Sequence, residues 1–181
     1  MAQSNPKGAK KTTKRALAGV AALLFVATVV WTTLPASSDT KPSAERAASP
    51  DLMARNLDGE QISLGDYPQK VKVVNFWAVN CHACRIEIPH LQSLYNKYKD
   101  VTIIGMGLDN DVEEIKRFVD RTDITYPVLV DGWETARAFD FRATPTTVLL
   151  DAHNRVYKTY VGVQGIETFK SDIDALLAER S

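Results

Sequence analysis

Cysteine and histidine are scarce in this chain, which has only Cys81 and Cys84 and three histidines among 181 residues. A second pair of closely spaced cysteines is missing, which argues against a closed zinc site. The sequence shows no internal repeat, and its length with 45% hydrophobic residues allows one globular domain and an appendage. Interest therefore centres on the single CxxC, CHAC at 81–84.

Acidic residues are absent from the first 34 positions, whereas five basic residues occur there: Lys7, Lys10, Lys11, Lys14 and Arg15. The rest of the chain therefore carries 17 basic and 22 acidic residues. Such a mildly acidic surface repels phosphate backbones, and no basic stripe interleaved with aromatic residues is present in it. The sequence thus argues against nucleic acid as a partner.

Charge is also absent from residues 16–34, ALAGVAALLFVATVVWTTL. As a helix this run would be roughly 28 Å long, close to the thickness of a bilayer core. The basic segment 1–15 before it predicts a cytoplasmic N-terminus and a single-pass cell-membrane protein whose C-terminal domain faces the periplasm or extracytoplasmic space. A cleaved signal peptide is the alternative, since ASS at 36–38 offers a processing site, but such signals usually have shorter apolar regions.

The segment 35–50, PASSDTKPSAERAASP, is dominated by Pro, Ser and Ala without apolar periodicity. This composition predicts a flexible linker. The globular domain is accordingly expected to span residues 51–181.

Short β-branched runs alternate with stretches of helical period in this domain. Strands are predicted at 71–76, 101–106, 127–130, 146–150 and 156–161, and helices at 81–99, 112–119 and 166–177. LDGEQISL at 57–64 is typical of a turn that leads into a short additional strand. The order predicts an α/β fold with a central mixed sheet flanked by helices on both faces.

The cysteine pair falls where a predicted strand ends and the next helix begins. Unpaired N–H groups and the helix dipole stabilise an anion at a helix N-terminus, so they favour a nucleophilic thiolate at Cys81. Cys84 lies one turn deeper on the same side and is suited to resolve a mixed disulfide formed at Cys81. The pattern therefore favours a redox centre.

Two other interpretations of the pair are weaker. A structural staple across so short a ring would stabilise the fold by only roughly 2 kcal/mol in the loop-entropy model. A metal site would need further ligands, yet the adjacent residues Cys81 and His82 point apart on a helix and His90 lies six positions beyond Cys84. A copper-handling module that uses the two thiolates and the distant His153 remains an alternative.

Two segments carry a family resemblance. VVNFWAVNCHACRIEIPHLQSLY at 73–95 resembles the active-site segment of thioredoxin-fold proteins, and ATPTTVLLD at 143–151 resembles their cis-proline loop. Together with LDGEQISL and the predicted membrane anchor, the pattern is similar to the TlpA/ResA-type thiol:disulfide interchange proteins. The resemblance covers residues 51–181 and implies a thioredoxin fold.

This resemblance implies roles for several residues. Cys81 would be the attacking cysteine, Cys84 the resolving one and Pro145 the cis-proline, which leaves the neighbouring backbone edge free to pair with an extended substrate. Thr144 would add a hydroxyl hydrogen bond to a thiolate, or else be an ordinary loop threonine. Glu87 is expected to handle the active-site proton, the alternative being a solvated helix carboxylate.

Four further positions bear on these roles. Asn75 replaces the aspartate that thioredoxins proper bury six residues before the first cysteine, and an amide cannot accept that proton. Trp77, Asn80 and His82 are expected to contact the substrate, although packing beneath the site is an alternative for Trp77 and an exposed spectator role is one for His82. Asn80 stands where a tryptophan is usual, which implies a more polar docking surface.

The resemblance further implies a reductant of specific protein disulfides outside the cytoplasm, with apocytochrome c and the cysteines of metal sites among the candidate substrates. A disulfide-forming oxidase of the same fold is the alternative. Partners would be cysteine-containing proteins and a membrane redox protein that recycles the pair. No cofactor and no resident metal is expected.

Overall fold

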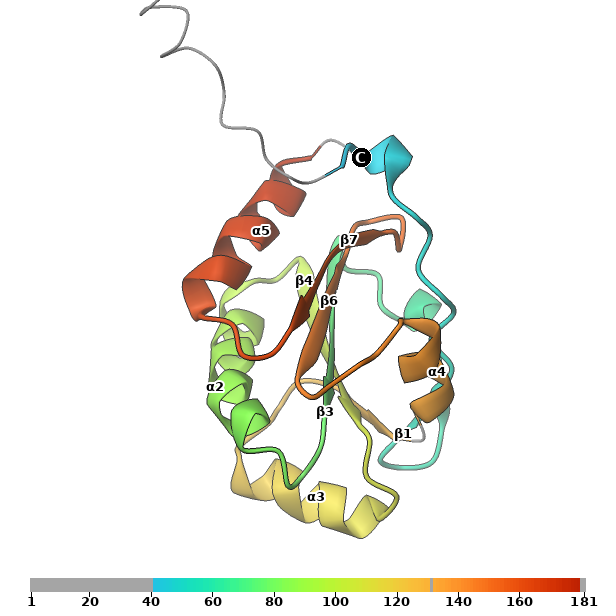
Figure 1. The fold of residues 1–181 in the computed structure, drawn as a ribbon, viewed down its shortest axis with the longest axis vertical. Helices are drawn as coiled ribbons and strands as arrows, with labels where there is room; N and C mark the ends of the chain where they lie inside the picture. The colour runs from blue at the N-terminus through green and yellow to red at the C-terminus, as the bar shows by residue number, and fades with distance from the viewer. Residues whose placement is uncertain (1–40, 131, 180–181) are drawn as a thin grey trace, which may run out of the picture. The chain divides into compact units, whose positions relative to one another are not determined.

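The computed structural model describes residues 41–130 and 132–179. They form one sheet of seven strands in the order β2-β1-β5-β4-β3-β6-β7, with helices on both faces (Figure 1). The strands are β1 (Ala54–Asn56), β2 (Gln61–Ile62), β3 (Val71–Trp77), β4 (Val101–Gly107), β5 (Val128–Val130), β6 (Thr146–Leu150) and β7 (Val156–Val161). The helices are α2 (His82–Lys97), α3 (Val112–Arg121), α4 (Trp133–Ala138) and α5 (Ile166–Ala178), with short 3₁₀ turns η1 (Ser43–Glu45) and η2 (Leu64–Asp66).

The sheet is mixed because β3, β4 and β5 run parallel while β6, β7 and β1 run antiparallel to their neighbours. The carboxyl ends of the three parallel strands therefore meet at one edge. Phe76 near the end of β3 is in register with Thr146 at the start of β6. This register brings the segment after β3, which holds the cysteines, to the same edge as the loop before β6, which holds Pro145.

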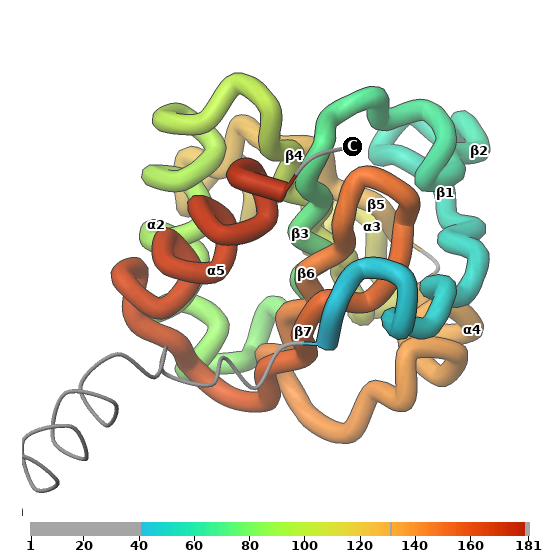
Figure 2. The backbone as a smooth tube through the Cα atoms, turned by 90° about the horizontal axis from the view of Figure 1, so that it is seen from above, coloured from blue at the N-terminus to red at the C-terminus, as the bar shows by residue number. Residues whose placement is uncertain are grey.

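Two apolar layers cover the two faces of the sheet. One contains Leu91 of α2, Phe118 of α3 and Ile173 of α5, and the other contains Ala136 of α4. Figure 2 shows α2 and α5 side by side on one face and α4 on the other. Because helices shield both faces, the central strands β3 and β4 are buried along their whole length.

The five predicted strands and three predicted helices are all present, with ends that differ by two residues or fewer. The sequence did not predict α4 or β1. Helix α4 has only six residues, WETARA, which is too short for a helical period to show. Strand β1 has three residues, ARN, and forms because its backbone pairs with β5 and β2.

The linker prediction is wrong for residues 41–50, which pack against the domain. This segment, drawn in blue in Figure 2, includes η1, and its Ala48 forms an antiparallel bridge with Arg155, the residue just before β7. The Arg46 side chain is buried: its Nη1 lies 3.2 Å from Asp151 Oδ2 and donates to Glu179 Oε2 at 2.8 Å. Composition could not reveal these partners, because both lie more than 100 residues away in the sequence.

The predicted basic segment 1–15, the predicted anchor 16–34 and residues 35–40 of the linker lie outside the described residues. Among those that the structure describes, none of the helices has the length and apolar character needed to cross a bilayer.

Arg46→Met is expected to lower the free energy of unfolding by about 3 kcal/mol, because it removes the buried guanidinium beside Asp151 and leaves that buried carboxylate with only the more exposed and more distant Arg155, at 3.4 Å. Burial alone would raise the pKa of Asp151, but N–H groups of Arg155 and His153 and the Arg46 side chain hold it below its usual value. A depressed carboxyl pKa contributes stability that is present above the unfolded value and is lost as the pH falls through the folded value.

Urea unfolding of Arg46→Met at pH 7 and across the acid range measures both effects. The matched control is Arg142→Met, which removes an exposed pair with Asp140 and should change stability by less than about 1 kcal/mol. Equal effects of the two substitutions would contradict the assigned role of Arg46.

Candidate active site

Cys81 and Cys84 are joined by a disulfide at the start of α2. Cys81 is the N-cap residue, and its Sγ accepts a hydrogen bond of 3.0 Å from the Cys84 N–H. Cys81 is partly exposed, whereas Cys84 is fully buried. The N–H and the helix dipole therefore stabilise a thiolate on Cys81, the sulfur that a protein substrate can reach.

Glu87 lies on α2 one turn after Cys84 and is fully buried, so it is not a solvated helix carboxylate. Its Oε2 accepts hydrogen bonds from Asn75 Nδ2 at 2.9 Å and from Thr147 Oγ1 at 2.8 Å. Its Oε1 accepts the main-chain N–H of Gln164 at 2.9 Å. Every donor comes from a different element, so the carboxyl group is held in one position.

Burial raises the pKa of the Glu87 carboxyl above its usual value, and the hydrogen bonds from Gln164 and Thr147 offset this effect only in part. A carboxylate with a raised pKa is a stronger base than an exposed one. Asn75 cannot itself take a proton, but its amide holds the group that can. The arrangement is therefore suited to receive a proton from the buried thiol of Cys84.

The Thr144–Pro145 peptide bond is cis, as the family resemblance implies. The Pro145 carbonyl accepts a hydrogen bond of 2.8 Å from the N–H of Gly162, next to the end of β7. Gly162 has a φ of +84°, a conformation that side chains disfavour, and it allows the chain to turn there toward Gln164. One short segment therefore contacts both parts of the site: Gly162 binds the cis-proline loop, and Gln164, two residues later, binds Glu87.

The other predicted substrate-binding residues separate into two groups. Asn80 and His82 are exposed beside Cys81, and Thr144 is partly exposed, so all three are accessible to a partner. Trp77 is fully buried, and its ring lies 4.9 Å from that of Phe118. Of the two interpretations of Trp77, the structure agrees with packing beneath the site and not with substrate contact, because a residue in a central strand covered on both faces packs inward.

Sequence reasoning missed Thr147, Gln164 and His90 as members of the site. Thr147 is one of two adjacent buried threonines at the start of β6, ahead of the apolar residues of that strand, a signal that the sequence does contain. Gln164 contributes a main-chain N–H, which no residue type reveals. His90 Nδ1 lies 3.1 Å from the Gln164 carbonyl oxygen, and because a carbonyl only accepts, that ring nitrogen carries the hydrogen.

A metal site at the cysteines gains no support from the geometry. Within residues 41–130 and 132–179, no three His, Cys, Asp or Glu side chains gather closely enough to hold an ion. His153 lies in the β6–β7 turn just beyond Leu150, which pairs with Lys72 at the far end of β3 from the cysteines. The copper alternative that uses His153 as a ligand is therefore wrong.

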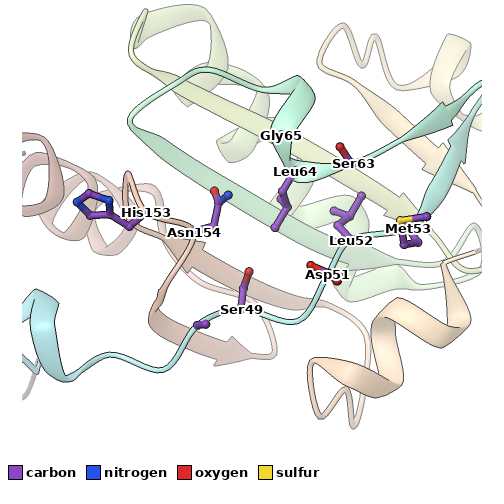
Figure 3. Close-up of a pocket in the computed structure, with 10 residues that line it drawn as sticks. Ser49, Asp51, Leu52, Met53, Ser63, Leu64, Gly65, His153 and Asn154 are labelled. Atoms are coloured by element: carbon purple, nitrogen blue, oxygen red, sulfur yellow. The ribbon is translucent and has the colours of Figure 1, made fainter.

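A cavity of about 300 Å³ lies at this distant side of the domain (Figure 3). Ser49 and Asp51 of the N-terminal segment, Leu64 of η2, and His153 and Asn154 of the β6–β7 turn contribute to its lining. None of the predicted catalytic or substrate-binding residues lines it. The chemistry of the cysteine pair therefore occurs at the sheet edge and not in this cavity.

Comparisons with known proteins agree with this site. The family described as Redoxin matches residues 34–177. Thiol-disulfide oxidoreductase ResA of Halalkalibacterium halodurans is 33% identical over 115 residues, 62% of this chain and slightly less than two thirds, 65%, of that protein. ResA of Geobacillus thermodenitrificans is 27% identical over 172 residues, 92% of this chain and 98% of its own length.

A solved structure is similar as well. The crystal structure of a putative thiol:disulfide interchange protein DsbE from Chlorobium tepidum superposes with a TM-score of 0.69 at 25% identity. The match covers 74% of this chain and 97% of that structure. The described sheet and helices therefore form a thioredoxin fold.

Proposed function

The chain belongs to the Redoxin family as a TlpA/ResA-type thioredoxin-like protein, and on that premise we propose that it is a thiol:disulfide oxidoreductase that reduces disulfides of protein substrates outside the cytoplasm. One observation carries the proposal: a cysteine pair at a helix N-terminus with a buried carboxyl group one turn behind it. The names of the ResA and DsbE relatives support the same activity.

The first step is attack by Cys81. Its thiolate, stabilised by the Cys84 N–H, bonds to one sulfur of the substrate disulfide, and the other substrate sulfur leaves as a thiolate. The accessible residues Asn80 and His82, which flank Cys81 in the chain, and Thr144, which precedes the cis-proline, contact the substrate chain in this proposal. Beside the cis bond, Pro145 leaves a backbone edge on which an extended substrate segment pairs.

The second step is resolution by Cys84. Its thiol loses a proton to Glu87, and the resulting thiolate attacks Sγ of Cys81 and expels the second substrate sulfur. The substrate disulfide is thereby reduced to two thiols, while Cys81 and Cys84 are oxidised to the disulfide seen in the structure. Burial of Cys84 keeps it from attacking substrates directly.

A chain that reduces substrates must have its own disulfide reduced again. The donor is a membrane redox protein, and residues 16–34 anchor the chain beside it with the domain outside the cytoplasm. The apolar run and the basic residues before it support this arrangement. Retention of the full-length protein in membranes after a high-salt wash tests it, whereas a soluble form that begins near Asp39 would indicate a cleaved signal.

The equilibrium reduction potential of the Cys81/Cys84 couple against glutathione or dithiothreitol tests the direction of electron flow. We expect a value nearer to that of thioredoxin, about −270 mV, than to that of the oxidant DsbA, about −120 mV. A value near the latter would favour the oxidase alternative. Absence of any dithiol–disulfide exchange with a protein substrate would refute the proposed activity itself.

A further inference from the structure

Three hydrogen-bond donors contact the Glu87 carboxylate, and they differ in how easily each can turn its hydrogen away from it. The Gln164 donor is a main-chain N–H, and the Asn75 donor is a side-chain amide whose nitrogen also donates to Thr147 Oγ1 at 2.8 Å. The third donor is the hydroxyl of Thr147. Only the hydroxyl can turn its hydrogen away by rotation about a single C–O bond, without movement of any heavy atom.

When Glu87 accepts a proton, the hydrogen-bond partner that its protonated oxygen requires changes from a donor to an acceptor. A protonated carboxyl oxygen becomes a donor and requires an acceptor, because burying it against another donor leaves a hydrogen bond unmade. A proton on Oε1 would face the Gln164 N–H, and the Gln164 main chain is held in place because its carbonyl accepts a hydrogen bond from His90. The proton is therefore accommodated on Oε2.

Two groups face Oε2, the amide of Asn75 and the hydroxyl of Thr147. Asn75 could accept only if its amide turned over by half a circle, which would exchange two heavy atoms in a packed interior. The Thr147 oxygen can accept as soon as its own hydrogen rotates away. It is fully covered in β6, so solvent does not compete for this bond.

We propose that Thr147 is a positioning residue that acts as the hydrogen-bond switch of Glu87, donating to the carboxylate and accepting from the carboxylic acid. This inference rests on the proposed function, in which Glu87 takes the proton of Cys84. The proton moves from Cys84 Sγ to Glu87 Oε2, while the O–H bond of Thr147 stays intact and only rotates. The switch thus lowers the cost of holding either protonation state in a buried site.

Other groups near Glu87 must be considered in a pH experiment. Cys84 and His90 share its helix, and the His90 ring favours the carboxylate. Tyr126, which precedes β5, is the other titratable group that interacts with Glu87, and burial together with the Glu87 charge raises its pKa. Tyr126 therefore stays protonated at neutral pH, and the His90→Gln variant separates the contribution of the ring.

The test compares three substitutions in one strand: Thr147→Val, Thr147→Ser and Thr146→Val. Thr146 is the matched control, since it is equally buried but donates to the Ala143 carbonyl and not to Glu87. The readouts are the pH profile of mixed-disulfide resolution and an infrared titration of the Glu87 carboxyl in the oxidised protein. The Glu87→Gln variant assigns the infrared band.

Thr147→Val should shift both profiles to higher pH by roughly one unit, because the carboxylate loses a donor that favours its charged form. Thr147→Ser should restore them, and Thr146→Val should leave them unchanged. Should Thr147→Val fold poorly, Thr147→Ala gives the same comparison with a smaller side chain. Unshifted profiles, or equal shifts in the Thr146 control, would overturn the inference.

The two readouts separate this inference from the proposed function. An infrared shift without any change in resolution would uphold the hydrogen bond from Thr147 but overturn the switch, and would mean that Glu87 does not take the catalytic proton. A different outcome is slow resolution in Glu87→Gln together with unshifted profiles in Thr147→Val. This outcome would support the proposed function and refute only the role of Thr147.

Discussion

The Cys84→Ser variant is expected to stop after one half-reaction and to accumulate a mixed disulfide between Cys81 and the substrate, one per chain. Cys81 retains its exposure and the main-chain N–H that stabilises its thiolate, so attack continues. No second sulfur is then available to expel the substrate. Non-reducing electrophoresis and mass spectrometry of the trapped complex measure the outcome, and multiple turnover should be lost.

Cys81→Ser is the matched variant and should trap very little, because the remaining thiol of Cys84 is fully buried. In the reduced wild-type protein, iodoacetamide should correspondingly alkylate Cys81 before Cys84. Preferential labelling of Cys84, or efficient trapping by Cys81→Ser, would reverse the assigned order of the two sulfurs.

Glu87→Gln should slow the resolution step on the order of 10²-fold, the lower end of the range for a positioned general base, and leave attack by Cys81 nearly unchanged. The amide has about the same size as the carboxyl group but cannot receive the Cys84 proton. Stopped-flow measurement of substrate release from a preformed mixed disulfide isolates this step. Glu113→Gln, an exposed glutamate on α3, is the control that should have no effect.

The same substitution should stabilise the fold at neutral and alkaline pH. A carboxyl group whose pKa is raised by folding binds its proton more tightly in the folded state. Its contribution to stability is therefore fully present below the unfolded pKa and is lost as the pH rises through the folded pKa. Glu87→Gln removes this loss, so its melting temperature should exceed that of the wild type above the folded pKa.

A series of thermal melts from pH 4 to pH 9 on the oxidised proteins measures this difference. Slower resolution combined with higher stability would mean that the buried carboxyl group is kept for chemistry at a cost to the fold. A variant that melts lower than the wild type across the whole series would contradict the assigned effect of burial on Glu87.

Local patterns in the sequence predict most of the architecture that positions the site. The β-branched runs locate β3, β4 and β6, and the change from strand to helical period after β3 puts Cys81 at the start of α2. Glu87 shares a helical side with Cys84 in both the sequence and the structure. Family resemblance, not local pattern, identified the cis bond before Pro145.

What the sequence could not predict depends on contacts between distant segments. The partners of Arg46 are far away in the chain, so a polar segment looked like a linker. The donors to Glu87 come from β3, β6 and the loop before α5, and one of them is main chain. The sequence left two interpretations of Trp77 open because an aromatic residue near a reactive cysteine can pack inward or outward, and only the position of α3 decides which.

The ion pair between Arg46 and Asp151 holds the segment after Lys41 at the end of the domain far from the disulfide. This segment is therefore a suitable place to attach a solid support or a fusion partner. Asp151 follows Leu150, which pairs with Lys72 near the start of β3, whereas the disulfide follows the end of that seven-residue strand. At about 3.3 Å per residue, the strand separates the two by about 20 Å. A partner protein joined ahead of Lys41, or a resin coupled there, would therefore leave the sulfur atoms open to large substrates.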